Sequence, residues 1–179
     1  NSVQEMFDLI IRAFNLAETY RTPVVVLADE IVAHMRERIE VPPKEHITIV
    51  DRKRPKSTDK VFFALEEVAP MPSVGEGFNV AVTGSTHDER GYRFGADHVV
   101  HQRLVKNLVG KILNNTDKIA NYEAHNVDDC DVGIVAYGCT SRAVYETIEL
   151  AKEKGIKVGY VRLKTLWPFP EDAVHDMAQ

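Results

Sequence analysis

The sequence has few cysteines, no long apolar run and no excess of basic residues, and each shortage excludes a class of protein. Its two cysteines, Cys130 and Cys139, are too few for a disulfide scaffold and lack the C-x-x-C spacing of a zinc or iron–sulfur motif. The longest apolar runs reach five residues, as from Val24 to Ala28, far short of the about 20 that a membrane helix needs. With 22 Lys+Arg against 27 Asp+Glu, the formal charge is −5, so a nucleic-acid-binding cation stripe is not expected. We therefore expect a protein of the reducing cytoplasm that binds neither membranes nor nucleic acid.

What is present is the composition of a folded domain. Of the 179 residues, 44% are hydrophobic and 27% are charged, which is ordinary for globular proteins. Ser2 and Glu5 have the spacing of a capping box, and the following residues are apolar around most of a helical circumference, with an inward stripe at Val3, Phe7 and Phe14. So wide an apolar surface predicts that chain preceding Asn1, or a partner, covers this helix.

Helical and strand patterns alternate through the rest of the chain, which predicts an α/β fold. Two prolines, Pro168 and Pro170, precede a last expected helix that starts near Glu171. We expect strands at 24–28, 79–83, 131–137 and 158–163, short strands or turns at 47–50 and 61–65, and helices at 30–38, 97–111 and 142–154. Residues 131–163 would then form a βαβ unit with parallel strands.

Several motifs could carry chemistry, and each has a plainer explanation. The turn Gly138–Ser141 precedes a helix and could receive an anion, but it lacks the other glycines or the lysine of a phosphate loop, so a capped turn is favoured. Cys139 could be a nucleophile at a helix N-terminus, although no base is identifiable beside it. His98 and His101 could share a metal, but no acidic ligand completes the set, so a solvated face is favoured and no metal site is predicted.

Charged residues at two other places are candidates for a substrate or an interface. His87, Asp88, Glu89 and Arg90 combine an imidazole, two carboxylates and a guanidinium, which suit proton transfer or carboxylate binding, with a salt-bridged loop as the alternative. Asp29 and Glu30 follow an expected strand at the edge where open α/β sheets bind ligands. Capping of the next helix by Asp29 is the competing explanation, and the local sequence favours it.

Four stretches of sequence carry a resemblance beyond these patterns. They are residues 1–30 with Arg21-Thr22-Pro23 and Ala28-Asp29-Glu30, Thr83–Gly91, Val135–Arg142, and Arg162–Pro170 with its Trp167-Pro168-Phe169-Pro170. Together they resemble the α subunit of 2-oxoacid:ferredoxin oxidoreductases, and the 2-oxoglutarate branch in particular. The resemblance extends over essentially the whole chain, in the family's order.

The resemblance implies oxidative decarboxylation of 2-oxoglutarate to succinyl-CoA, with coenzyme A as co-substrate and ferredoxin as electron acceptor. It implies thiamine diphosphate and magnesium at an interface with a β subunit, an iron–sulfur cluster in that partner, possible further small subunits, and no activity of this chain alone. The alternatives are pyruvate or a branched-chain 2-oxoacid as substrate, or a non-catalytic α/β binding or assembly module.

The resemblance also implies a division of the chain. Residues 1–42 would end a pyrimidine-side thiamine diphosphate domain, 43–124 would connect it, and 125–179 would start a transketolase C-terminal-like domain, both domains being partial. The acid that activates the cofactor would lie upstream of Asn1, so no catalytic residue is assigned. Arg90 and Arg93 are the candidates for binding the second carboxylate of the substrate, because arginine binds carboxylates in a bidentate manner.

Overall fold

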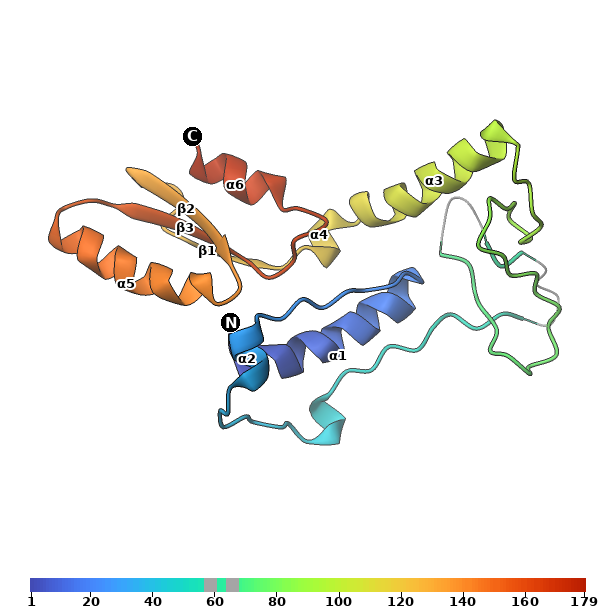
Figure 1. The fold of residues 1–179 in the computed structure, drawn as a ribbon, viewed down its shortest axis with the longest axis horizontal. Coiled ribbons are helices and arrows are strands. Elements are labelled where there is room, and N and C mark those ends of the chain that lie inside the picture. The colour runs from blue at the N-terminus through green and yellow to red at the C-terminus, as the bar shows by residue number, and fades with distance from the viewer. Residues whose placement is uncertain (57–60, 64–67) are drawn as a thin grey trace. The chain divides into compact units, whose positions relative to one another are not determined.

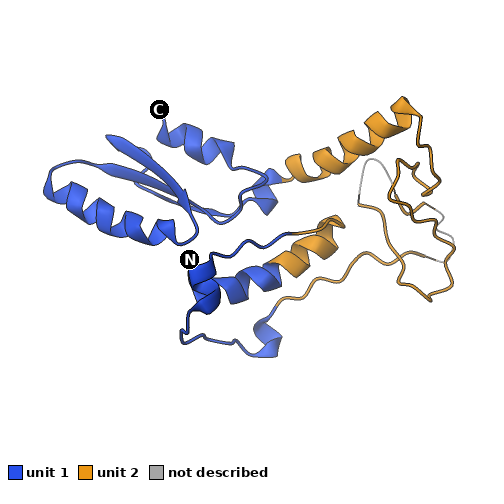
Figure 2. Cartoon of the chain, in the orientation of Figure 1, with its two compact units in different colours: residues 1–12, 25–47, 116–179 blue, residues 13–24, 48–115 orange. Residues whose placement is uncertain are grey.

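The computed structural model of the chain describes residues 1–56, 61–63 and 68–179 (Figure 1). The chain divides into two units, one made of residues 1–12, 25–47 and 116–179 and the other of residues 13–24 and 48–115 (Figure 2). Each unit therefore joins segments that are distant in sequence. Among the described residues, none of the helices combines the length and the apolar character that crossing a membrane requires.

The first unit contains a three-stranded sheet. Strand β3 (Val158–Leu163) lies between β1 (Tyr122–His125) and β2 (Val132–Tyr137), antiparallel to β1 and parallel to β2. Helix α5 (Thr140–Glu153) connects β2 to β3. The predicted βαβ unit and the α/β fold class are thus confirmed. Strand β1 was not predicted, because its four residues, YEAH, form only a short alternating run and include no β-branched residue.

The core of this unit lies on both faces of β3, all six residues of which are buried. Because side chains alternate along a strand, Tyr160 packs with Ala136 and Val144 beneath α5, and Val161 packs on the opposite face. That opposite face is covered by α6 (Glu171–Met177), so the sheet lies between two helices (Figure 1). Pro168, which follows a cis peptide bond, is also fully buried.

Helix α1 (Val3–Tyr20) begins as the capping pattern predicts. The Ser2 Oγ accepts a hydrogen bond from the backbone N–H of Glu5 at 3.1 Å. The described residues cover its apolar surface only in part, since Phe14 remains 71% exposed and Ile10 42% exposed. That further chain or a partner covers this surface stays a prediction.

Helix α2 (Glu30–His34) is shorter than the predicted helix at 30–38. Beyond Met35, contacts with the first turn of α1 hold the chain in an extended path: the Glu37 carboxylate accepts from Val3 N–H at 2.9 Å, and Glu40 N–H donates to the Gln4 side chain at 2.6 Å. Tertiary hydrogen bonds thus replace the helical ones that local propensity favours. A single 3₁₀ turn, η1 (Lys44–His46), follows.

Two predicted strands are wrong. Residues 24–28 and 79–83 are not in strands, and Val25 and Leu27 are 78% and 74% exposed. A strand needs a neighbour with which to exchange backbone hydrogen bonds, and the sheet of the described residues contains only β1, β2 and β3. Residues 47–50 are likewise outside strands, and the predicted element at 61–65 lies partly outside the described residues.

The second unit contains α3 (His98–Leu113), which confirms the helix predicted at 97–111 and extends it by two residues at its end. Its start is capped by the Asp97 carboxylate, which accepts from Val99 N–H at 2.9 Å and Val100 N–H at 3.1 Å. Its sequence pattern places Leu108 and Ile112 on one apolar side, but only Ile112 is buried, and Leu108 is 49% exposed. The described part of the chain leaves that side of the helix uncovered. A short helix, α4 (Thr116–Ile119), then leads into the sheet of the first unit.

Candidate functional site

The segment from Thr86 to Phe94 reverses direction around Asp88. His87 and Arg93 form an antiparallel bridge, and the Asp88 carboxylate accepts from Arg90 N–H at 3.0 Å and Tyr92 N–H at 2.9 Å. One carboxylate oxygen therefore holds two backbone donors of the turn. Asp88, predicted as a candidate acid, base or ligand, serves here as a turn residue.

Gly91 is required by the same turn. Its φ is +88°, and a Cβ at this position would lie 2.1 Å from the carbonyl oxygen of Ala81 and 2.9 Å from the Phe63 ring. Only glycine combines this backbone conformation with so close an approach. The glycine at the end of the charged motif thus has a structural reason.

The remaining candidates of this segment separate into two groups. His87 is oriented inward, with Nδ1 2.9 Å from the Ser85 carbonyl oxygen and its ring 4.9 Å from the Phe63 ring. Glu89, Arg90 and Arg93 are exposed, and their side chains form no hydrogen bond or ion pair within the described ranges. The segment therefore presents two guanidinium groups, unpaired within the described ranges, on a turn held by the Asp88 carboxylate.

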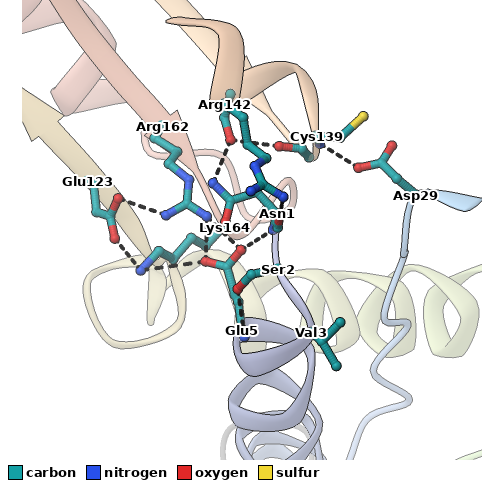
Figure 3. A network of polar contacts seen from close by, with 12 residues as sticks. Asn1, Ser2, Val3, Glu5, Asp29, Glu123, Cys139, Arg142, Arg162 and Lys164 are labelled. Atoms are coloured by element: carbon teal, nitrogen blue, oxygen red, sulfur yellow. Dashed lines mark hydrogen bonds and ion pairs between the residues drawn. The ribbon is translucent and has the colours of Figure 1, made fainter. Parts of the chain in front are cut away.

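Asp29 lies in the first unit, with its carboxylate directed at the turn before α5 (Figure 3). Its Oδ2 accepts a 2.6 Å hydrogen bond from the backbone N–H of Cys139. Although Asp29 holds the N-cap position of α2, its side chain makes no capping bond there, so the favoured explanation of Asp29 as a cap is wrong. The carboxylate instead lies at the N-terminus of α5, where the helix dipole favours negative charge.

Gly138 makes this approach possible. It has φ +61°, and a Cβ there would lie 2.4 Å from Asp29 Oδ2. The Gly138–Ser141 turn, considered as an anion site, therefore receives a carboxylate of its own chain. Next to it, the Ser141 side chain donates to the Gly138 carbonyl at 2.6 Å and is fully buried.

A network of four charged side chains lies near this turn and was not predicted (Figure 3). One guanidinium nitrogen of Arg162 lies 2.6 Å from both carboxylate oxygens of Glu5, and another lies 2.8 Å from Glu123. Lys164 Nζ lies 2.5 Å from Glu123 and 3.8 Å from Glu5. The signal in the sequence was an arginine within the otherwise apolar strand VGYVRL, because a buried charge needs a partner.

The electrostatics of this network favour the charged forms. The hydrogen bond from Lys164, with a further contribution from Arg162, lowers the pKa of Glu123 to about 2 even though burial opposes the shift. Burial alone would lower the pKa of Arg162, but its hydrogen bond with Glu123 and the charge of Glu5 raise it. The four side chains carry two positive and two negative charges, and the Asn1 amino group is a further cation that pairs with Glu5.

The other candidates are not brought together. His98 and His101 are exposed, and the Nδ1 of His101 lies 2.9 Å from the Thr86 hydroxyl. Within the described part of the chain, no group of three or more His, Cys, Asp or Glu side chains could hold a metal ion. Asp29 also fills the turn before α5, so that turn is not free to receive a diphosphate. No reaction step is therefore assigned to a residue of this chain.

Two stretches of the chain match known families. Residues 1–107 match the thiamine diphosphate-binding family described as pyruvate flavodoxin/ferredoxin oxidoreductase. The chain belongs to this family. Residues 130–179 match core domain II of pyruvate:ferredoxin oxidoreductase. The resemblance to 2-oxoacid:ferredoxin oxidoreductases is thereby confirmed, as is a thiamine diphosphate-binding domain.

Curated relatives match over the full chain. The 2-oxoglutarate synthase subunit KorA of Methanothermobacter marburgensis is 46% identical, with 100% of this chain aligned to 48% of that protein. The KorA subunit of Methanocaldococcus jannaschii is also 46% identical, over 96% of this chain and 46% of the relative. A ketoisovalerate oxidoreductase subunit VorB of Methanothermobacter thermautotrophicus is 33% identical over 99% of the chain. The chain thus spans about half the length of the curated relatives it matches.

A solved structure has the same fold. The 2-oxoglutarate:ferredoxin oxidoreductase from Magnetococcus marinus, determined with 2-oxoglutarate, coenzyme A and succinyl-CoA bound, superimposes with a TM-score of 0.84 at 28% identity. The alignment covers 99% of this chain and 32% of that one. The fold of the described residues is therefore that of a segment of this oxidoreductase.

Proposed function

We propose that this chain is part of the α subunit of a 2-oxoglutarate:ferredoxin oxidoreductase. The observation that carries the proposal is that three KorA subunits of 2-oxoglutarate synthases are 43–46% identical to the chain, above the 33% of a ketoisovalerate oxidoreductase subunit, whereas a fourth KorA subunit, from Archaeoglobus fulgidus, is 32% identical. All these comparisons cover at least 96% of the chain, so the differences do not come from unequal alignments. The three higher identities favour the 2-oxoglutarate branch over a branched-chain substrate.

In the proposed reaction, 2-oxoglutarate and coenzyme A give succinyl-CoA and carbon dioxide, and two electrons pass to ferredoxin. Thiamine diphosphate, when bound, supplies the carbanion chemistry of the decarboxylation. We assign the diphosphate and magnesium site and the iron–sulfur cluster to a β subunit, with further small subunits allowed. The free thiols of Cys130 and Cys139 suit the cytoplasm, which we propose as the location.

The proposed division of the chain follows from the same family. Residues 1–42 would end the pyrimidine-side thiamine diphosphate domain, 43–124 would connect, and 125–179 would begin the transketolase C-terminal-like domain. The catalytic acid would lie upstream of Asn1. The two matched families, at 1–107 and 130–179, support a two-part organisation of the chain.

Arg90 and Arg93 remain our candidates for the second carboxylate of 2-oxoglutarate. Both are exposed on the turn held by Asp88, and in the described part of the chain neither guanidinium is paired. We expect Arg90→Gln or Arg93→Gln to raise the KM for 2-oxoglutarate without an equal fall in kcat, because a dicarboxylate loses one anchor. Arg103→Gln on α3, which removes a guanidinium elsewhere in the second unit, is the control.

The proposed activity is tested on the native complex, purified anaerobically with this chain as bait and supplied with thiamine diphosphate. Reduction of a viologen dye is compared with 2-oxoglutarate, pyruvate and 2-ketoisovalerate, each with and without coenzyme A. Coenzyme A-dependent activity with 2-oxoglutarate, and none with the other two 2-oxoacids, supports the proposal. Activity only with pyruvate or 2-ketoisovalerate would change the substrate, and inactivity with all three would favour a non-catalytic module.

A further inference from the structure

The first unit consists of an N-terminal and a C-terminal part, and polar side chains connect them. The N-terminal part comprises residues 1–12 and 25–47, and the C-terminal part, residues 116–179, contains the sheet. Both apolar clusters around the sheet are built from residues within 127–177. The side chains that reach from the N-terminal part to the C-terminal part include Glu5, Asp29 and Arg12, whose guanidinium donates to the carbonyls of Lys118 and Ile119. Polar interfaces of this kind are typical of parts that can move relative to one another.

Arg162 is central to this junction. Its side chain is only 9% exposed, and that of Glu5 is 15% exposed. It extends from β3 on the same face as Tyr160, since residues two apart share a face, and it pairs with Glu123 on the adjacent strand. The same guanidinium binds the first turn of α1 through Glu5 (Figure 3).

Such a network contributes more to geometry than to net stability. Removing two carboxylates and two cations from water has a large desolvation cost, so the attraction within a buried network is mostly offset. The hydrogen bonds are nevertheless directional, and Arg162 uses separate nitrogens of one planar guanidinium for Glu5 and Glu123, which fixes the two carboxylates relative to each other. If one partner is lost, the charges that remain are uncompensated.

We propose that Glu5, Glu123, Arg162 and Lys164 form an ionic latch that sets the orientation of α1 on the sheet. The Asp29 contact with Cys139 N–H is a second attachment point, at the end of β2. When the latch is closed, the first turn of α1 is held at β3. When Arg162 or Glu5 is neutralised, the latch opens and the orientation of α1 is no longer unique. The latch is a conformational device and is independent of which substrate the enzyme uses.

The test measures the distance between α1 and α5 in the natural complex. Spin labels are attached to p-acetylphenylalanine at positions 8 and 149, both exposed in the native protein, so that no cysteine is modified. A control pair at 149 and 172 lies wholly on the helices that cover the sheet and reports its integrity. Samples carrying one label identify distances between copies of the subunit.

Three variants separate orientation from stability. Arg162→Met breaks the network, and Glu5→Gln opens only its link to α1. The double variant Glu5→Gln, Arg162→Met removes one carboxylate and one cation and keeps the pair of Glu123 with Lys164. We expect the wild type to show one narrow distance peak for the pair 8 and 149. All three variants should lose that peak while the control pair keeps its own.

The double variant is decisive, because it removes one charge of each sign and leaves no unpaired charge among the four side chains. Loss of the peak in the double variant with an intact control distance supports the latch. Retention of the narrow peak in Glu5→Gln or in the double variant would overturn it, since α1 would then be oriented by other contacts.

Discussion

Ionisation of Glu123 makes the stability of the folded chain depend on pH. Its pKa is about 2 in the folded chain against an ordinary value of 4.5, chiefly because of the hydrogen bond from Lys164. A lowered carboxyl pKa contributes stability above about pH 4.5, and this contribution is lost as the pH falls toward about 2. Because the side chain is still 35% exposed, we expect screening by water to limit Glu123→Gln to a loss of about 1 kcal/mol at neutral pH.

Thermal unfolding of the wild type and of Glu123→Gln at a series of pH values checks the pH dependence of this stability contribution. The difference between the two midpoints should narrow as the pH falls through the window below about 4.5. Glu149→Gln, at an exposed position of α5, is the matched control and should show no such narrowing. A difference for Glu123→Gln that stays constant with pH would contradict the assigned pKa.

Substitution of Gly138 tests how closely the Asp29 carboxylate approaches the turn before α5. Gly138→Ala would place a Cβ 2.4 Å from Asp29 Oδ2 at a φ of +61°. Gly155→Ala is a matched control, because Gly155 has a φ of +72° and nothing within 4 Å of its Cβ position. Both should lose about 1 kcal/mol from backbone strain, and Gly138→Ala should lose more.

The extra loss should depend on Asp29. In chemical denaturation, Asp29→Ala should reduce the difference between the two alanine variants, because it removes the atoms that the Cβ meets. Equal losses for Gly138→Ala and Gly155→Ala would show that Asp29 does not approach this turn.

Helix α3 depends on its first residues. Asp97→Ala removes the acceptor for two backbone N–H groups and should destabilise the start of the helix by about 1 kcal/mol. Hydrogen exchange of the amides of Val99 and Val100 should accelerate. Asp97→Asn keeps a side-chain oxygen and is expected to exchange nearly as the wild type does, whereas equal acceleration in both variants would argue against capping.

Elements whose partners are close in sequence were predicted well. The cap at Ser2, the helix that begins near residue 97 and the βαβ unit at 131–163 follow from local patterns, and all three are confirmed. The strand expected at 24–28 was wrong, because its β-branched residues are typical of a strand but do not determine which other strand would pair with it. Helix α2 ends early because Val3 and Gln4 bind the chain beyond it, and no pattern within 30–38 contains that information.

For the candidate sites as well, the sequence identified residues but not the contacts that they make in the fold. Sequence identified the charged segment at 87–93 but not that Asp88 is used by the turn and His87 by Ser85 and Phe63. It missed the pairing of Glu5 with Arg162, because the two residues are 157 positions apart. An arginine in an apolar strand indicates a buried partner without naming it.

For the whole molecule, the exposed apolar side chains predict association. Phe14 of α1 is 71% exposed, and Ile49 and Val82 are 71% and 75% exposed. We expect the 179-residue chain produced alone to bind a hydrophobic dye and to self-associate at neutral pH, since such surfaces are usually covered in the native assembly. Light scattering with dye fluorescence checks this. A monomer that binds no dye would contradict the expectation that a partner or further chain covers α1.

The most direct test of the proposed function follows the carboxyl carbon of the substrate. The native complex, prepared anaerobically with thiamine diphosphate, is given 2-oxoglutarate labelled at C1, and labelled carbon dioxide is measured together with reduced ferredoxin. We predict release that requires both coenzyme A and oxidised ferredoxin, with one succinyl-CoA formed for each carbon dioxide. No release from 2-oxoglutarate by an intact complex would contradict the proposed function.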